Sequence, residues 1–181
     1  MEKKKPKFIE DKKERGEWAE SVFLARAAEN GLPVSKPFGD SNSFDCVVGT
    51  PGKFVAVQVK CTLAKSENGR GYICSVCSSH KAYRPGAFDF LAAYVIPEDA
   101  WYIIPAKLIH GQRKSISLCT TEVGEGKYER YREAWDLLRE ATACDEVEQA
   151  APPEESAIGP GFARMQGAMN AFRRMMERGG R

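Results

Sequence analysis

The sequence lacks a long apolar run and a strong excess of charge of one sign, and each absence excludes a class of protein. No apolar stretch reaches the roughly 18 residues that a membrane-spanning helix needs, so we expect no membrane association. The charged N-terminal residues are not followed by an apolar segment, which indicates no secretory signal and a cytoplasmic location. The formal charge of the 181-residue chain is only +2, so the total does not indicate a nucleic-acid-binding protein.

The six cysteines also lack the pattern of a structural zinc site. Only Cys74 and Cys77 have the spacing of metal ligands, and the sequence has no second pair of this kind. If residues 72–77 form a strand, these two side chains point to opposite faces of it. We therefore interpret both as buried structural residues with reduced thiols.

The near-zero total hides a segregation of charge along the chain. Residues 1–16 carry seven Lys or Arg against four acids, and residues 161–181 carry five Arg and one Glu. Between them, residues 142–160 carry five acids, three prolines and no base. We predict a charged arm over residues 1–11, a folded domain over 12–141, an acidic flexible linker over 142–160 and an amphipathic helix over 161–178.

The predicted C-terminal helix has a heptad-like apolar seam flanked by arginines. Its apolar seam could dock on the domain or form a dimer. Alternatively, its arginines could bind DNA. A Met-rich seam is adaptable apolar surface, which favours docking or a partner contact. The seam consists of Ile158, Phe162, Met165, Met169, Phe172 and Met176.

Hydrophobic periodicity within residues 12–141 predicts a helix, a run of strands and a second helix. The first helix covers residues 12–30, with Trp18, Val22 and Ala25 as its apolar stripe and Gly31 at its C-terminal cap. The strands are predicted over residues 32–36, 44–48, 54–61, 72–77, 88–96, 101–104 and 115–118. The second helix is predicted over residues 128–141, with apolar positions at Tyr128, Tyr131, Trp135 and Leu138. This order indicates an α/β fold with one central sheet.

A Pro51-Gly52 turn predicts a hairpin that brings three polar side chains together. With this loop, Asp45 lies opposite Gln58, and Lys60 lies two residues further on the same face. A Pro-Gly turn does not fix the register firmly, and a bulge would shift this pairing by one residue. A plain cross-strand ion pair between Asp45 and Lys60 is the commoner arrangement. The alternative is a divalent cation held by Asp45, with Gln58 offering a neutral oxygen and Lys60 steering a water. In that case Glu17 or Glu20 on the first helix would supply a second carboxylate.

Six segments, in this order, resemble the PD-(D/E)xK nuclease superfamily. The resemblance is to its branch of small proteins related to a group I intron homing endonuclease, which has a QxK form of the motif. The segments are GEWAE at 16–20, SFD at 43–45, VQVKCT at 57–62, FDFLAAY at 88–94, WYIIP at 101–105 and YERYREAW at 128–135.

The resemblance implies a restriction-endonuclease-like, also called tRNA endonuclease-like, three-layer sandwich. Its central mixed β-sheet is flanked by helices, as in Holliday junction resolvases. It further implies Mg²⁺-dependent hydrolysis of DNA phosphodiester bonds, with Mn²⁺ as a substitute ion. By matched position, Asp45 is the main metal ligand, Glu20 the helix carboxylate and Lys60 the motif lysine. Gln58 stands where most of the superfamily has Glu or Asp, and it completes the metal ligands and the catalytic set.

Local basic residues are the candidates for DNA contact, and solvated surface is the alternative for each of them. The candidates are Lys65, Arg70, His80, Lys81 and Arg84. Superfamily nucleases that cut both strands often dimerise, so a homodimer is expected for such an activity. Two other function classes stay open: a catalytically weak or inactive nucleic-acid-binding module of the same fold, and a non-catalytic interaction protein.

Overall fold

The computed structural model describes residues 9–39, 42–67, 69–78, 81–109, 114–119 and 126–143. All of them belong to the first of the two units into which the chain divides, residues 1–144 and 145–181. Three predicted features lie outside the described residues: residues 1–8 of the arm, His80 and the C-terminal helix. The predicted linker also lies outside them, except for its first two residues, 142 and 143. Within the described part, no helix is long and apolar enough to cross a membrane.

The first helix, α1, spans Lys12–Glu29, close to its predicted bounds. It begins at Asp11, whose side chain accepts hydrogen bonds from the backbone N–H groups of Lys13 and Glu14 at 2.8 and 2.9 Å. It ends at Asn30, and Gly31 follows with a φ of 71°, a left-handed conformation that glycine adopts at little cost.

The predicted apolar stripe of this helix is wrong by one position. The buried face consists of Ala19, Phe23 and Ala27. Two alanines let the helix approach the sheet closely, and Phe23 between them fills the space against Trp101, with ring centroids 5.6 Å apart. The prediction followed the largest side chain, Trp18, which is 38% exposed at the edge of the helix.

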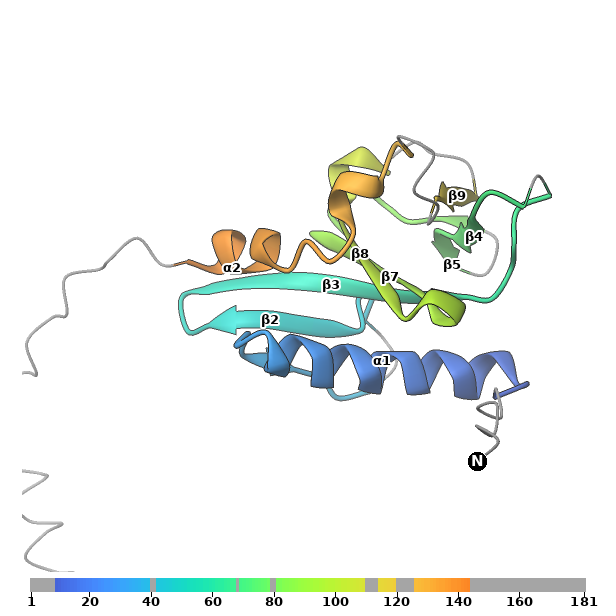
Figure 1. Cartoon of the computed structure of the whole chain (residues 1–181). Helices are drawn as coiled ribbons and strands as arrows, with labels where there is room; N and C mark the ends of the chain where they lie inside the picture. The colour runs from blue at the N-terminus through green and yellow to red at the C-terminus, as the bar shows by residue number, and fades with distance from the viewer. Residues whose placement is uncertain are drawn as a thin grey trace, which may run out of the picture. The chain divides into compact units, whose positions relative to one another are not determined.

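The central sheet has five strands in the order β1-β2-β3-β7-β8 (Figure 1). The pair β3–β7 is parallel and the other three pairs are antiparallel, so the sheet is mixed, as predicted. The strands are β1 (Val34–Ser35), β2 (Cys46–Thr50), β3 (Lys53–Thr62), β7 (Phe90–Val95) and β8 (Ala100–Pro105). Helix α1 runs along this sheet and contacts β3 and β1.

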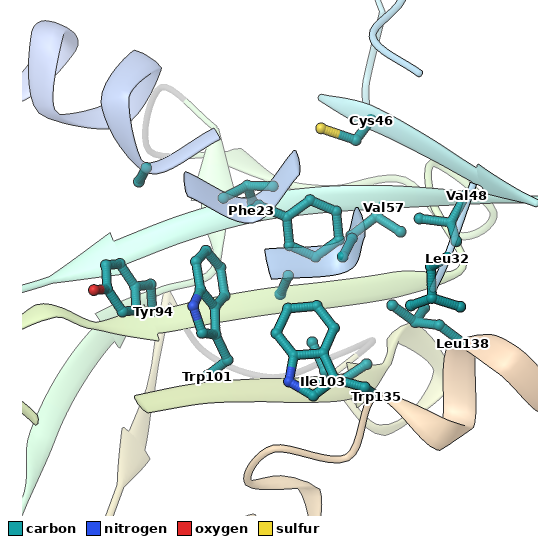
Figure 2. Close-up of a cluster of buried hydrophobic side chains, with 14 of the residues drawn as sticks. Phe23, Leu32, Cys46, Val48, Val57, Tyr94, Trp101, Ile103, Trp135 and Leu138 are labelled. Atoms are coloured by element: carbon teal, nitrogen blue, oxygen red, sulfur yellow. The ribbon is translucent and has the colours of Figure 1, made fainter. Parts of the chain in front are cut away.

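Both faces of β7 and β8 are buried, which explains their nearly continuous apolar sequence. On the α1 side, Trp101 and Ile103 pack with Phe23 and with Val57 of β3 in one core (Figure 2). The alternate residues, Tyr102 and Ile104 among them, belong to a second core on the other side of the sheet. The sheet is therefore the middle layer of the fold.

The second core is covered by small sheets rather than by a long helix. Strand β4 (Tyr72–Ser75) pairs with β9 (Ser115–Leu118), and β5 (Cys77–Ser78) pairs with β6 (Lys81–Ala82). The strand predicted over 72–77 is therefore interrupted at Val76, whose backbone N–H bonds to the carbonyl of Lys114. Cys74 is fully buried, as interpreted from the sequence, but Cys77 is only half-buried, so the interpretation is wrong for that residue.

The helix predicted over 128–141 is wrong in its first half. A 3₁₀ turn, η3 (Glu129–Tyr131), and a short helix, α2 (Asp136–Thr142), replace it. Between them Glu133 has a φ of 50°. Tyr128 and Tyr131 pack in the second core, whereas Trp135 and Leu138 pack in the core beneath α1. One helix cannot place its apolar stripe on both sides of a sheet, so the chain turns between the two pairs.

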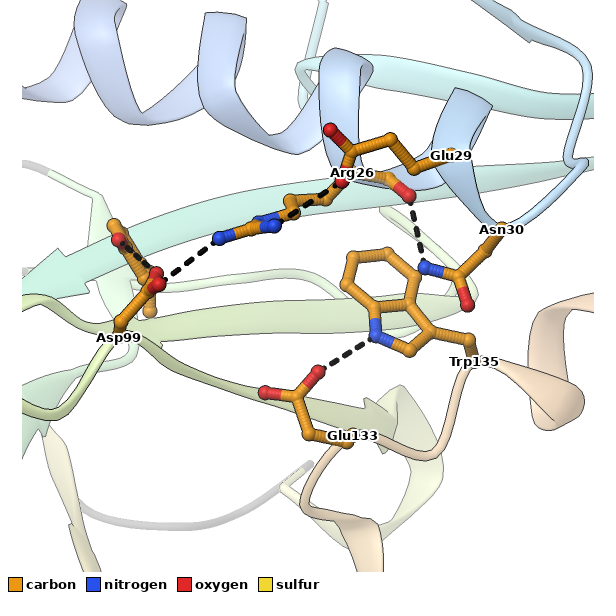
Figure 3. Close-up of polar contacts among 7 residues, drawn as sticks. Arg26, Glu29, Asn30, Asp99, Glu133 and Trp135 are labelled. Carbon is orange, nitrogen blue, oxygen red and sulfur yellow. Dashed lines mark hydrogen bonds and ion pairs between the residues drawn. The ribbon is translucent and has the colours of Figure 1, made fainter.

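Polar contacts fix the C-terminal half of α1 against the β7–β8 connection (Figure 3). Arg26 bonds to Glu29 at 3.1 Å and to Asp99 at 2.9 Å. The other carboxylate oxygen of Asp99 accepts the Tyr94 hydroxyl at 2.7 Å. These exposed ion pairs contribute little free energy individually, but they join α1 to the strand that lies parallel to β3.

Candidate active site

The β2–β3 hairpin brings Asp45 and Gln58 together at the end of its ladder. Thr50 pairs with Lys53 and Cys46 with Val57, so residues 46–50 keep the predicted register. Asp45 lies just before β2, and its backbone N–H bonds to the carbonyl of Val57 at 3.0 Å, one residue out of that register. Asp45 and Cys46 thus both oppose Val57, which is the pattern of a β-bulge, so the predicted direct pairing of Asp45 with Gln58 is shifted by one residue. The two-residue Pro51-Gly52 loop, with Gly52 at a φ of 99°, fixes the register of the residues that do pair.

The Asp45 carboxylate is held by two donors from β3. Its Oδ2 accepts a short hydrogen bond from Nε2 of Gln58 and a second, at 2.8 Å, from the backbone N–H of Val59. Burial raises the pKa of Asp45, the Val59 N–H opposes this, and the nearby Glu20 charge adds to the increase. The hydrogen bonds to Asp45 therefore do not fully replace the water that its carboxylate loses on folding.

Lys60 does not form the plain ion pair with Asp45 that its position suggested. Among the described residues, no ion pair of 4.0 Å or less joins these two side chains. Lys60 Nζ instead lies 5.7 Å from the ring centre of Tyr83. Burial lowers the pKa of Lys60, but a hydrogen bond with Tyr83 and the Asp45 charge outweigh it and raise the pKa overall. Lys60 is therefore an ammonium at neutral pH.

Of the two candidate helix carboxylates, Glu20 faces the site and Glu17 does not. Glu20 lies one turn before Phe23 on α1, its side chain is 19% exposed, and its Oε2 is 2.7 Å from Nζ of Lys36. Glu17 is 60% exposed and lies 3.8 Å from Lys13. The hydrogen bond with Glu20 raises the pKa of Lys36, and the charge of Asp45 adds to this increase. Lys36 therefore contacts Glu20 and interacts with the charge of Asp45.

An open cavity of about 690 Å³ adjoins the three hairpin residues. One wall is the segment before β2, the other is the segment between β6 and β7, and Ser43 Oγ bonds to the Ala87 carbonyl between them at 2.8 Å. Tyr83 and Arg84 project from the second wall. The lining consists of Asn42, Ser43, Asp45, Gln58, Lys60 and residues 82–87.

Of the three predicted DNA-contacting residues whose side chains the structure describes, Arg84 lines this cavity and the other two do not. Lys65 and Arg70 are exposed in the connection between β3 and β4. Lys81 lies in β6, but its side chain is outside the described part of the structure, as is His80.

Oxygen donors suited to a hard cation gather around Asp45. Within the described residues, no group of three or more His, Cys, Asp or Glu side chains could hold a metal ion. The further oxygen donors near the Asp45 carboxylate are the Gln58 amide, the Val59 carbonyl and the Glu20 carboxylate. The Val59 carbonyl oxygen is 3.3 Å from Nε2 of Gln58. Carboxylate, amide and carbonyl oxygens with waters fit Mg²⁺, which typically keeps several waters and takes one or two carboxylates. The neighbouring Cys46 is not suited, because burial raises the pKa of its thiol to about 12.

Two residues of the site, Lys36 and Tyr83, were not predicted from the sequence. Both lie in connecting segments, where no periodicity indicates which way a side chain points. Lys36 follows β1 directly, and only the contacts of β1 with α1 and β2 bring it near Glu20 and Asp45. Tyr83 precedes the predicted Arg84, and an aromatic residue beside a basic one in a loop was the only available signal.

Comparisons with known proteins support the resemblance seen in the sequence. Residues 10–138 match the family described as PD-(D/E)XK endonuclease. A solved structure of a bacterial homing endonuclease, I-Ssp6803I, is similar at a TM-score of 0.63 with 29% identity, covering 72% of this chain and 95% of that one. No curated protein sequence matches the chain. The predicted α/β, restriction-endonuclease-like fold is confirmed, and the chain belongs to the PD-(D/E)XK endonuclease family.

Proposed function

We propose that the protein is a Mg²⁺-dependent endonuclease that hydrolyses DNA phosphodiester bonds, with Asp45, Gln58, Lys60 and Glu20 as its active-site residues. Membership of the nuclease family supports the reaction class. The observation that carries the proposal is the convergence of Asp45, Gln58 and Lys60 on one cavity that also exposes Arg84. A carboxylate, an amide oxygen and an ammonium beside an open space suit a phosphate ester and the cation that accompanies it.

Asp45 and Gln58 would hold the metal, with the Val59 carbonyl and Glu20 able to bind it or its waters. A bound Mg²⁺ supplies a Lewis acid for the phosphate and lowers the pKa of a coordinated water; Mn²⁺ can replace it. Because Gln58 presents its amide nitrogen to Asp45, a half-turn of the amide would bring its oxygen to the same place.

Lys60 would act as a fixed positive charge rather than as a base. Its raised pKa keeps it protonated at neutral pH, so it can donate hydrogen bonds to a water and to the phosphate but cannot accept a proton. A charge placed where negative charge develops stabilises the transition state. Tyr83, beside the ammonium, would hold it in that position.

DNA is the proposed substrate, and Arg84 is the proposed phosphate contact nearest to the scissile bond. Lys65, Arg70, His80 and Lys81 are proposed as further contacts along the strand, because backbone phosphates are recognised mainly by Lys and Arg. Cutting both strands of a duplex calls for two active sites or two binding events, so we propose a homodimer for that activity. Light scattering with and without duplex DNA tests the dimer.

A catalytically inactive nucleic-acid-binding module is the second candidate function. The observation that favours it is that Asp45 faces an amide nitrogen where most of the superfamily has a carboxylate. Under this alternative the protein binds DNA equally well with Mg²⁺ or with a chelator and never cuts it.

Plasmid cleavage distinguishes the two functions. We expect nicking or linearisation of supercoiled DNA by the full chain in Mg²⁺, none in a chelator, and none by Asp45→Ala or Lys60→Ala variants that remain folded. Full activity of either variant would overturn the residue assignment. DNA binding by the wild-type chain without any cleavage would favour the inactive module.

A further inference from the structure

Lys36 is the charged residue beside the candidate metal site to which the proposed function gives no role. Its ammonium is 2.7 Å from Oε2 of Glu20, and the side chains are 49% and 19% exposed, respectively. The Asp45 charge also favours the charged form of Lys36. The ammonium is therefore bound to Glu20 and is close enough to Asp45 to interact with its charge.

Two carboxylates that approach each other need a cation between or beside them. Glu20 already raises the pKa of Asp45, which is the expected effect of like charges at short range. Lys36 offsets this repulsion in the metal-free protein. A divalent ion bound by Asp45 would offset it as well, but it would also repel the ammonium. Glu20 cannot give the same oxygen fully to Lys36 and to the water shell of a metal.

We propose that Lys36 is a built-in counter-ion that competes with Mg²⁺ for Glu20, and that it thereby sets the metal affinity of the site. This inference rests on the proposed function, because it takes Asp45 as a metal ligand. Lys36 is a positioning residue in this role: it holds the helix carboxylate in place before the metal arrives and leaves it when the metal binds.

Removal of the ammonium is therefore expected to tighten metal binding. In calorimetric titrations of the full chain with MgCl₂, we expect Lys36→Met to bind about tenfold more tightly, since it removes one like charge beside the ion. Lys36→Arg keeps the charge and should stay close to the wild-type affinity. Lys13→Met, which removes an exposed lysine 3.8 Å from Glu17 on the same helix, is the matched control and should have no effect.

A measurement on the wild-type chain tests the same idea without a variant. Acetylation of Lys36 by limiting acetic anhydride, followed by mass spectrometry, should be faster in saturating Mg²⁺ than in a chelator. The reason is that only the neutral amine attacks the anhydride, and Lys36 must leave the Glu20 carboxylate before it gives up its proton and reacts. Lys13 should be modified at the same rate in both conditions.

The outcomes separate this inference from the proposed function. If the wild-type chain binds Mg²⁺ but the Lys36→Met variant binds it no more tightly, the role of Lys36 is wrong and the metal site stands. Acetylation of Lys36 that does not respond to Mg²⁺ would likewise overturn the competition. If neither protein binds Mg²⁺, the metal site falls, and the inference falls with it. Binding by the variant alone would support the competition in its strongest form.

Discussion

Nε2 of Gln58 donates a hydrogen bond to Oδ2 of Asp45, the oxygen that also accepts the backbone N–H of Val59. The two β3 donors thus converge on one oxygen of a half-buried carboxylate. The QxK form of the motif therefore has a structural role in the metal-free protein: its amide nitrogen supplies a neutral donor to Asp45. A glutamate at this position would instead place a second negative charge against Asp45.

Gln58→Glu is expected to strengthen Mg²⁺ binding and to weaken the metal-free fold. The added carboxylate attracts the cation, an effect on the order of tenfold in affinity for one added charge. Without metal it repels Asp45 and removes its donor. Calorimetry should show tighter Mg²⁺ binding, and the melting temperature should fall in a chelator and recover in Mg²⁺. Gln58→Met, which has neither charge nor oxygen, is the control and should bind Mg²⁺ less tightly than wild type. Weaker binding by Gln58→Glu would contradict the ligand role of this position.

Asp45→Asn should abolish cleavage and raise stability at neutral pH. The pKa of Asp45 is raised in the folded protein, above its ordinary value of 3.8 in the unfolded chain. The folded state therefore binds the proton more tightly, and wild-type stability falls as the pH rises from 3.8 through the folded pKa. Asparagine keeps the shape and an acceptor oxygen but carries no charge to bury.

Thermal melts in a chelator between pH 4 and pH 8 measure this effect. The melting temperature of Asp45→Asn should exceed that of wild type at pH 7, and the gap should narrow towards pH 4. Asp136→Asn, which alters a carboxylate whose side chain is 80% exposed, serves as the matched control and should show no such pH trend. A variant that melts below wild type at pH 7 would show that the Asp45 charge is well compensated.

Tyr83→Phe should shift the alkaline limit of cleavage to lower pH. The Tyr83 hydroxyl is one of the groups that raise the pKa of Lys60, and the phenylalanine ring keeps the edge contact with Phe88, whose centroid is 5.0 Å away. Loss of the hydroxyl lowers the pKa of Lys60, so the ammonium deprotonates earlier as the pH rises. The rate at neutral pH should fall by about threefold to tenfold, the effect of one typical hydrogen bond of about 1 kcal/mol.

Rate–pH profiles of Tyr83→Phe and wild type, taken at saturating DNA, test this role. Tyr83→Ala also removes the ring and should lose more activity than Tyr83→Phe. An equal loss of rate at every pH, with no displacement of the alkaline limb, would mean that Tyr83 supports the cavity wall and does not act on Lys60.

The sequence predicts this site well where it depends on local rules. A two-residue turn fixes the hairpin register as far as the pair Cys46–Val57, and the period of two along β3 sets Gln58 and Lys60 on one face. Both residues line the cavity together with Asp45. The choice of Glu20 over Glu17 depends on how α1 rotates against the sheet. That rotation is decided by the fit of Ala19, Phe23 and Ala27 in the core. Periodicity alone predicted the buried face of the helix about one residue away from where it lies.

Contacts between segments far apart in sequence could not be predicted in this way. Lys36 reaches Glu20 because β1 packs against α1, and Tyr83 reaches Lys60 because the β6–β7 segment closes one wall of the cavity. The break in the helix predicted over 128–141 has the same origin. The local pattern is helical, but the two halves of its apolar stripe belong to different cores.

Glu133 is the residue that fixes this break. Its carboxylate accepts Nε1 of Trp135 at 2.8 Å (Figure 3). It also accepts the backbone N–H of Trp101 at 2.7 Å, and the N–H of Glu133 bonds to the Trp101 carbonyl at 2.8 Å. It thereby pairs with the outer side of β8, the last strand in the sheet order. A φ of 50° is unfavourable for glutamate, so these bonds must outweigh the strain.

Glu133→Ala is therefore expected to lower the free energy of unfolding by about 2–3 kcal/mol, because two donors lose their acceptor. Glu133→Gln keeps one oxygen acceptor and should lose less. Urea denaturation measures both values, with the exposed α2 residue Glu140→Ala as the control for loss of a surface carboxylate. Glu133→Gly removes the same acceptor but relieves the φ strain, so it should be more stable than Glu133→Ala. The opposite order would mean that the left-handed conformation carries no strain and that the two hydrogen bonds alone hold the turn.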